Sequence, residues 1–452
     1  MHPKLCRTEW LAFGFALAVA AAGFAHQWWY PSNLFDAAQY AEMGRNIVEH
    51  GPFSRFMESQ VRTYGYPAFL SLVYLAADTA RLPSVLLLFL AQFGLYIAAA
   101  LVLRRSIAWQ SPPAARVVFC GLMLNYYALL YTPECLTESV SLSAIVLLGA
   151  GWLEASRRHG SIAVLGLASL LAGGAVLIRP ANVAAAAVWV AGAALIAVRS
   201  RFGIARAILA AAVITAGMAV PFLPQFTYNG LQFGRWTPLL ARDLGQRQQA
   251  WGIEDIKYAT AVPPVPGASV HYVNPWLRGT TFDVDAPLEW YVAHPGRGAL
   301  TLAAHSFNLT DQDLLFTYSR DLDPWYRIPL GVINHSVVVL GAIGLLLGVG
   351  RARRSGSQTS TDALGLVILT LVAVWAMHVW TAVEMRFGLA LLCALFPAAL
   401  YTLLALARAR NRRTIATAAV VVALYVAGAL RVSAWVRDQS PLIRAAVADR
   451  RR

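Results

Sequence analysis

Apolar residues gather along this chain in blocks of about twenty, separated by short polar connections. About twenty residues in a helix that hydrogen-bonds its own backbone are needed to cross the hydrocarbon of a membrane. The blocks predict eleven membrane-spanning helices, at residues 9–29, 82–103, 117–132, 137–155, 161–178, 180–198, 207–223, 328–350, 363–382, 385–407 and 414–434. The predicted fold class is therefore an all-α polytopic membrane protein.

The spacing of the predicted helices divides the chain into four parts. The first part, 1–223, carries seven helices and an outer loop at 30–81. A long polar segment at 224–327 precedes the helices of 328–434, and a basic tail at 435–452 ends the sequence.

The outer loop contains a segment with helical rather than membrane-spanning periodicity, "NLFDAAQYAEMGRNIVEHG" at 33–51. Four side chains fall on one stripe at positions i, i+4, i+7 and i+11: Asp36, Tyr40, Met43 and Ile47. The pattern predicts a helix that lies along the membrane surface with its apolar stripe against lipid.

Asp36 stands near the start of this predicted helix and has two interpretations. With Asn33 as N-cap, Asp36 takes the third helical position, where its charge complements the helix dipole. A carboxylate at this place can equally serve the chemistry of a site. The segment alone leaves both interpretations open.

Two further segments are predicted to be interfacial helices. "RTYGYPAFLSLVYLA" at 62–76 begins with Arg62, Tyr64 and Tyr66, and tyrosines are typical anchors at a membrane surface. Residues 296–307 form the second amphipathic segment, inside the long polar loop.

Composition supports the membrane assignment, because 58% of residues are hydrophobic and only 13% are charged. A net charge of +14 would suit a nucleic-acid-binding protein, but the basic residues stand in alternate connections between the helices. The positive-inside rule places those connections in the cytoplasm, so the N-terminus is expected inside and the C-terminus outside. We expect no nucleic-acid partner.

The four cysteines, without paired spacing, predict neither a disulfide framework nor a zinc site.

The first apolar block also has features of a cleaved signal peptide, with Lys4 and Arg7 before it and small residues near Gly23. The aromatic cluster at 28–30 favours a retained span, because such clusters lie at membrane interfaces. The Ala- and Arg-rich composition is typical of a high-GC bacterium, which suggests a bacterial inner membrane.

Acidic residues and isolated arginines meet on the outer side, where the positive-inside rule does not explain the arginines. Besides the first loop, the short outer turns "YTPECLTES" (131–139), "LIRPAN" (177–182) and "TAVEMRFG" (381–388) supply them. The outer set comprises Asp36, Arg55, Arg62, Glu134, Glu138, Arg179, Glu384 and Arg386. This arrangement predicts a functional site at the outer, periplasmic membrane surface.

The order of these motifs resembles the GT-C superfamily of membrane glycosyltransferases. The resemblance combines the aspartate of the first outer helix, "GYPAFLSLVY", "LTES", "IRPAN" and "EMRFGLALLCALFPAALY". The nearest pattern is the bacterial branch with lipid A aminoarabinose transferases, protein O-mannosyltransferases and lipopolysaccharide-core sugar transferases. It covers 10–200 well, 325–405 moderately and the long loop only loosely.

The resemblance implies a sugar donor on a polyprenyl phosphate or diphosphate, a glycan, lipid or protein acceptor, and Asp36 as general base. Many members of the superfamily carry two acidic residues in this loop, whereas the next acidic residue here is Glu42. A metal ion bridging the phosphate is therefore not supported, since hard cations need several oxygen ligands. Arg62, Arg179 and Arg386 are the candidates for binding the donor phosphate. No P-loop is present, so a nucleotide sugar is not expected.

Other outer residues have a structural interpretation beside the functional one. Arg179 precedes Pro180 and suits a snorkelling arginine, and Glu138 suits stabilisation of a helix N-terminus. Glu384 and Arg386 suit an ion pair that holds two helices together.

Further possible cavity residues are the tyrosines Tyr64 and Tyr66 and two histidines. His378 is interpreted mainly as a packing histidine. His305, with Asp311 and Asp313, could face the cavity, but we expect all three to be solvated loop residues.

Three rival classes share this composition. A transporter or flippase would place ionisable residues at the membrane midplane, whereas the predicted spans here are nearly free of charge. An O-antigen ligase or polymerase also uses lipid-linked sugars, but would not carry an aspartate on a helix after its first span. A purely structural subunit leaves the outer acidic and arginine residues unexplained.

Overall fold

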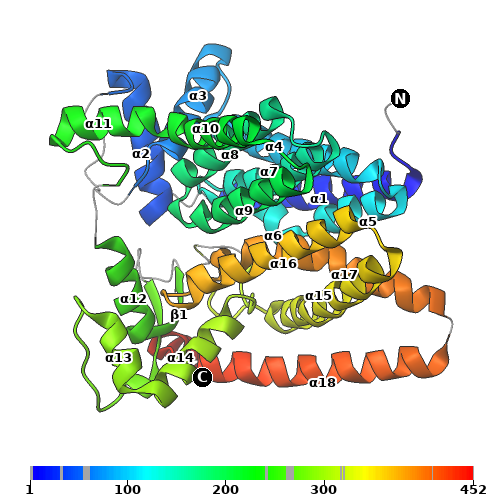
Figure 1. Ribbon diagram of the computed structural model, residues 1–452. Helices are drawn as coiled ribbons and strands as arrows, with labels where there is room; N and C mark the ends of the chain where they lie inside the picture. Colours follow the sequence, from blue (N-terminus) through cyan, green and yellow to red (C-terminus); the bar gives the residue numbers. More distant parts are fainter. Residues whose placement is uncertain are drawn as a thin grey trace. The chain divides into compact units, whose positions relative to one another are not determined.

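The computed structural model describes residues 4–30, 34–53, 62–239, 243–260, 269–315, 318, 321–409 and 411–450. In these ranges the chain is mostly helical, and nine helices are long and apolar enough to cross a membrane. The predicted fold class, an all-α polytopic membrane protein, is confirmed (Figure 1).

The chain forms two compact units, each described by itself. Unit 1 comprises Met1–Ala241 and Val349–Val374, and unit 2 comprises Arg242–Gly348 and Trp375–Arg452. The predicted parts 1–223, 224–327, 328–434 and 435–452 follow the order of segments along the chain, whereas these units follow packing. Two helices contribute to both units: α15 (Arg327–Ser355) and α16 (Gln358–Val379).

Unit 1 carries most of the membrane-spanning helices. Its other elements are α1 (Arg7–Trp29), α2 (Phe35–His50), α3 (Gly65–Ala80), α4 (Ser84–Ala108), α5 (Pro112–Met123), α6 (Tyr126–Leu130), α7 (Glu138–Arg157), α8 (Ile162–Ile178), η1 (Pro180–Asn182), α9 (Val183–Arg199), α10 (Ile204–Ala219), η2 (Val220–Phe222) and α11 (Leu223–Phe233). Its core lies between α7, α8, α9 and α10, where Trp152 and Trp189 are buried among alanine and leucine side chains.

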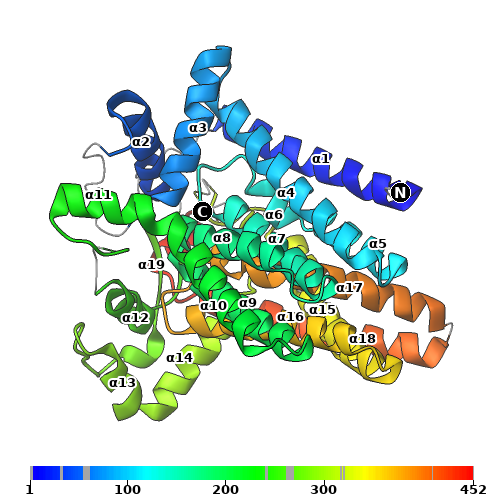
Figure 2. The same ribbon diagram turned by 45° about the horizontal axis from the view of Figure 1, so that its top comes forward.

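Unit 2 combines helices with a small sheet. Its other elements are α12 (Leu244–Glu254), β1 (Asp255–Thr260), β2 (Ser269–Val273), η3 (Pro275–Leu277), α13 (Pro287–Ala293), α14 (Pro295–Asn308), η4 (Met385–Gly388), α17 (Leu389–Ala409), α18 (Arg412–Arg437) and α19 (Pro441–Arg450). The strands pair antiparallel. Both views group α12, α13 and α14 together (Figures 1 and 2).

One prediction from hydropathy is wrong in detail. The expected span at 117–132 is broken, because α5 ends at Met123 and Asn125 caps the short helix α6 by accepting the amide hydrogen of Ala128 at 3.3 Å. Apolar composition continues through a turn, so hydropathy alone does not reveal such a break.

The amphipathic helices form where they were predicted, but α2 has a different partner. Tyr40, Met43 and Ile47 are buried within the protein rather than turned toward lipid. A Cβ atom on Gly44 would lie 2.8 Å from Leu70 Cβ of α3, so the two helices approach closely at this glycine. Figure 2 shows α2 and α3 side by side. The stripe read from the sequence is therefore a helix–helix contact.

Gly65 brings the start of α3 against the end of α8. A Cβ atom at this position would lie 2.7 Å from the carbonyl oxygen of Leu177, closer than real Cβ contacts allow. The "GYP" segment thus needs glycine, and the close approach places the residues before α3 beside the turn that carries Arg179.

We expect Gly65→Ala to lower the free energy of unfolding by about 1–3 kcal/mol, because the added methyl group meets backbone that cannot rotate away. Thermal unfolding of the detergent-solubilised protein measures the change. Gly94→Ala is the matched control, since nothing lies within 4 Å of its Cβ position in α4. Equal unfolding temperatures for the two variants would contradict the close approach.

Candidate active site

Asp36 lies in the first turn of α2, and its side chain forms an ion pair with Arg62. The N-cap of α2 is Leu34, whose side chain makes no capping hydrogen bond; Asn33, the predicted cap, lies outside the described residues. Arg62 also donates from Nε to Gln39 Oε1 at 3.2 Å. The carboxylate of Asp36 therefore binds a side chain from another segment of the outer loop.

A second ion pair joins α7 to the turn after α8. Arg179 Nη1 donates to Glu138 Oε1 at 2.6 Å, and Glu138 is buried. Asn182 holds the turn in place, because its amide donates to the carbonyl of Ala175 at 2.8 Å and its Oδ1 accepts from Ser141 at 2.8 Å. The "RPAN" motif thus fixes Arg179 above the N-terminus of α7.

Tyr40 lies in the electrostatic field of both ion pairs. Burial raises the pKa of the Tyr40 phenol; Arg62 and Arg179 lower it, and Asp36 and Glu138 raise it further. The Arg62 guanidinium lies 5.1 Å from the centre of the Tyr40 ring. We call these residues the acid–arginine cluster: Asp36, Tyr40, Arg62, Glu138 and Arg179. The structure thus brings together four residues of the predicted site within unit 1.

The two predicted cavity tyrosines lie at the start of α3, and Tyr66 contacts this cluster. The Tyr66 ring packs edge-on against Tyr40 with centroids 5.0 Å apart, and burial raises the pKa of Tyr66 well above its ordinary value. Tyr64 donates from Oη to the carbonyl of Pro52 at 2.8 Å, and its backbone amide donates to Gln225 at 2.6 Å. These tyrosines contact protein groups, whereas interfacial anchors would lie in the lipid headgroups.

The remaining predicted site residues belong to unit 2. Arg386 Nε donates to Glu384 Oε2 at 2.6 Å within one turn before α17. His378 is buried, and its ring lies edge-on to Phe387 with centroids 5.1 Å apart. A role of Arg386 in binding phosphate stays a prediction.

The prediction that His305, Asp311 and Asp313 are solvated is wrong, since all three are buried. His305 lies 2.7 Å from the carbonyl of Val379 and 3.1 Å from that of Asp255, and burial lowers its pKa. An imidazole between two carbonyls in the interior has a structural role.

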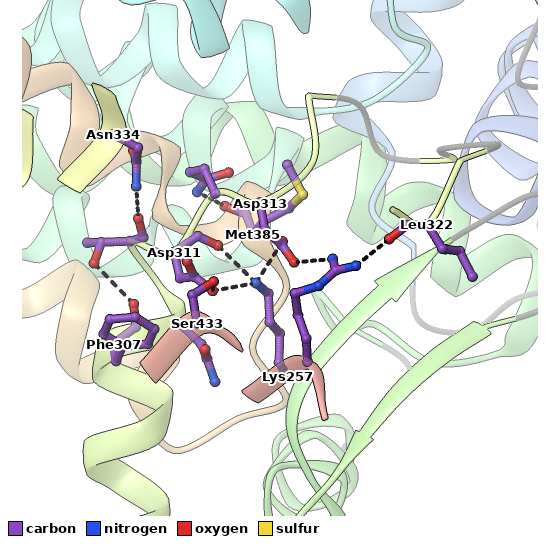
Figure 3. A network of polar contacts seen from close by, with 12 residues as sticks. Lys257, Phe307, Asp311, Asp313, Leu322, Asn334, Met385 and Ser433 are labelled. Carbon is purple, nitrogen blue, oxygen red and sulfur yellow. Dashed lines mark hydrogen bonds and ion pairs between the residues drawn. The ribbon is translucent and has the colours of Figure 1, made fainter. Parts of the chain in front are cut away.

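Asp311 and Asp313 are buried because they bind Lys257, a fully buried lysine on β1 (Figure 3). The ammonium donates to the carbonyl oxygen of Asp311 at 3.0 Å, to Asp311 Oδ2 at 2.9 Å and to Asp313 Oδ1 at 2.8 Å. Arg437 of α18 donates to the other oxygen of Asp313 at 3.2 Å, and Ser433 donates to Asp311 at 3.1 Å. All three hydrogens of the ammonium therefore have acceptors.

Sequence reasoning missed both Lys257 and the central position of Tyr40. The signal for the first is a single lysine inside the alternating segment "DIKYAT", together with two aspartates in "TDQD". Within the described ranges no group of three or more His, Cys, Asp or Glu side chains is placed to hold a metal ion.

No protein-family model and no curated protein matches this chain. Two similar solved structures are of archaeal oligosaccharyltransferase from Archaeoglobus fulgidus. AglB, in complex with an inhibitory peptide and a dolichol-phosphate, has 12% identity and a TM-score of 0.42 over 94% of this chain and 56% of its own. The apo form has 13% identity and a TM-score of 0.43 over 93% and 54%. The chain thus spans little more than half the length of these proteins, and no residue role is carried over from them.

The buried pair Glu138–Arg179 should contribute more to stability than an exposed one. In a double-mutant cycle of Glu138→Gln and Arg179→Gln, we expect a coupling energy of about 2–3 kcal/mol, because each single variant removes a counter-ion 2.6 Å from a poorly solvated charge. The control is the exposed pair Arg45–Asp78, for which we expect less than about 1 kcal/mol. Thermal unfolding measures both cycles, and equal coupling energies would refute the distinction.

The Lys257 network predicts a loss of stability in acid. Burial alone would raise the pKa of Asp311, but the Lys257 ammonium and the contact with His335 lower it below the ordinary value. A folded-state pKa that is depressed stabilises the fold above the ordinary pKa of about 4, and the contribution is lost as pH falls through the folded pKa. The stability gap between wild type and Asp311→Asn should therefore stay nearly constant from pH 7 to about pH 4 and shrink from there to pH 3.

The unfolding temperature measured across this pH range tests the expectation. Asp285→Asn is the control, because Asp285 is exposed in the same unit. A gap of constant size for Asp311→Asn would show that its carboxylate is not the group responsible.

Proposed function

We propose that this chain is an inverting glycosyltransferase of the GT-C class. It would transfer a sugar from a polyprenyl-phosphate donor to an acceptor hydroxyl at the outer face of a bacterial inner membrane. The observation that carries the proposal is the acid–arginine cluster, in which two carboxylates and two guanidinium groups surround one buried phenol. This set supplies both a proton acceptor and cations suited to phosphate.

The arginines would bind the donor phosphate. A guanidinium fork matches two phosphate oxygens, as it matches two carboxylate oxygens. The guanidinium groups of Arg62 and Arg179 each bind a carboxylate, so both are already oriented to bind an anion. A phosphate that takes the place of Asp36 on Arg62 would release the carboxylate where the reaction needs it. Arg386, with Glu384, remains a proposed third phosphate contact.

Asp36 would then act as general base in a single displacement. The acceptor oxygen attacks the anomeric carbon while its proton passes to the Asp36 carboxylate. The bond from the anomeric carbon to the phosphate oxygen breaks, and its electron pair leaves on the polyprenyl phosphate. The leaving phosphate gains one negative charge, which the arginines stabilise as it develops. The configuration at the anomeric carbon inverts.

The exposure of the pairs supports different roles for the two carboxylates. The side chains of Asp36 and Arg62 are 23% and 21% exposed, whereas Glu138 is only 3% exposed. Asp36 is the accessible carboxylate of the cluster and is assigned the proton transfer. Glu138 is assigned the task of holding Arg179 toward the phosphate.

We expect Asp36→Asn to lower turnover by about 10²- to 10⁴-fold, the usual contribution of general base catalysis. Donor KM should stay unchanged or fall, because the amide no longer competes with phosphate for Arg62. The assay uses protein in lipid nanodiscs, radiolabelled polyprenyl-phosphate sugars and an envelope extract as acceptor. Release of free polyprenyl phosphate is measured.

Asp78→Asn is the matched control, since Asp78, like Asp36, forms an ion pair with an arginine (Arg45 of α2) but lies outside the cluster. It should keep wild-type turnover. Equal turnover for wild type and Asp36→Asn would reduce Asp36 to a structural ion pair. No consumption of any donor by wild type would refute the proposed activity and favour transport.

A further inference from the structure

The turn that carries Glu384 and Arg386 is held by groups from three separate segments of unit 2. We propose that Gln312, fixed by the Lys257 network, is a positioning residue that sets the place of Arg386. The inference rests on the proposed function, in which Arg386 contacts the donor phosphate. We call residues 382–386 the arginine turn.

Backbone contacts fix the arginine turn without using its side chains. The amide of Tyr258 on β1 donates to the carbonyl of Val383 at 2.7 Å, and the amide of Ala382 donates to the carbonyl of Gln248 at 3.1 Å. The side-chain amide of Gln312 donates to the carbonyl of Met385 at 2.6 Å. The carbonyl directly before Arg386 is therefore held by Gln312.

Gly388, two residues after the arginine turn, allows close contact with the segment that carries Gln312. A Cβ atom on Gly388 would overlap the carbonyl oxygen of Leu309, so the two backbones are in direct contact. Leu309 and Gly388, the last residue of η4, thus lie in direct backbone contact.

The direction of Gln312 follows from its two neighbours. Asp311 and Asp313 both bind Lys257 (Figure 3). Gln312 lies between them in the sequence, and its side-chain amide donates to the carbonyl of Met385. Lys257 is next to Tyr258, whose amide holds Val383. These contacts form a closed ring. Strand β1 binds the arginine turn through Tyr258, the turn binds Gln312, and the aspartates on either side of Gln312 bind Lys257 of β1.

This ring is stiff because its charges are fully buried. Lys257 and Gln312 have no exposed surface, and Asp311 and Asp313 are 1% and 2% exposed. Breaking one contact would leave a polar group in the interior without its partner, which is costly. The contacts from β1 and Gln312 described above are made to backbone carbonyls of the turn, so Gln312 is assigned a positioning role toward Arg386 rather than a contact with the donor.

The test replaces Gln312 with methionine, which keeps the side-chain length and removes the N–H donor. Hydrogen–deuterium exchange of the amides of residues 382–387, without donor, should become about 5- to 30-fold faster. Donor KM should rise by a similar factor with kcat changed less than about 3-fold. Gln246→Met is the control, since Gln246 makes an exposed hydrogen bond to Asp285 in the same unit.

A double variant separates positioning from a general structural effect. Arg386→Gln removes the proposed phosphate contact, so adding Gln312→Met to it should raise donor KM no further. Additive effects, or unchanged exchange in Gln312→Met, would overturn the inference. If wild type consumes no donor, the proposed function fails and the inference falls with it. If wild type turns over but Gln312→Met alters neither KM nor exchange, only the inference fails.

Discussion

The constraint on which this structure depends is that a buried charge needs a counter-ion, because an isolated ion in a low dielectric costs several kcal/mol. Arg104 meets Glu9 at 2.5 Å, and Glu9 has no exposed surface. Arg179 meets Glu138, and Lys257 meets two aspartates. Each of these contacts joins an element of the chain to a partner at least 41 positions away. Each buried charge therefore requires a contact between two distant segments, in addition to the apolar packing of the helices.

Where two backbones approach closely, small residues make the pairing possible. Gly65 admits the end of α8, and Gly44 admits α3 against α2. These glycines bring together the segments that carry Asp36, Arg62 and Arg179. The acid–arginine cluster thus depends on packing that has no charge of its own, and any substitution that separates these helices would also separate the ions.

Hydropathy and periodicity were sufficient to predict most of the helices, because each helix produces its own pattern in a short stretch of sequence. Hydropathy located the long helices, and periodicity located α2 and α14, because each signal is contained in a window of one helix. The hairpin of β1 and β2 was missed, and so was the burial of Asp311. Its partner Lys257 lies 54 positions earlier, and nothing near "TDQD" indicates that contact. The pairing of Asp36 with Arg62, 26 positions apart, was likewise beyond local patterns, although both residues were selected individually.

The same chemistry, carboxylate with cation, has opposite consequences in the two units because burial differs. In unit 2 the Lys257 ammonium is fully buried and donates to three oxygens, so an incoming anion would have to displace contacts that water cannot replace. In unit 1 the Asp36–Arg62 pair is about one-fifth exposed, and water can solvate each partner as the other leaves. Screening by solvent makes such a pair weak and therefore exchangeable. A phosphate can compete for Arg62 at little cost, whereas Lys257 is committed to the fold. Exposure, rather than residue type, thus separates the ion pair suited to binding a ligand from the one suited to holding the structure.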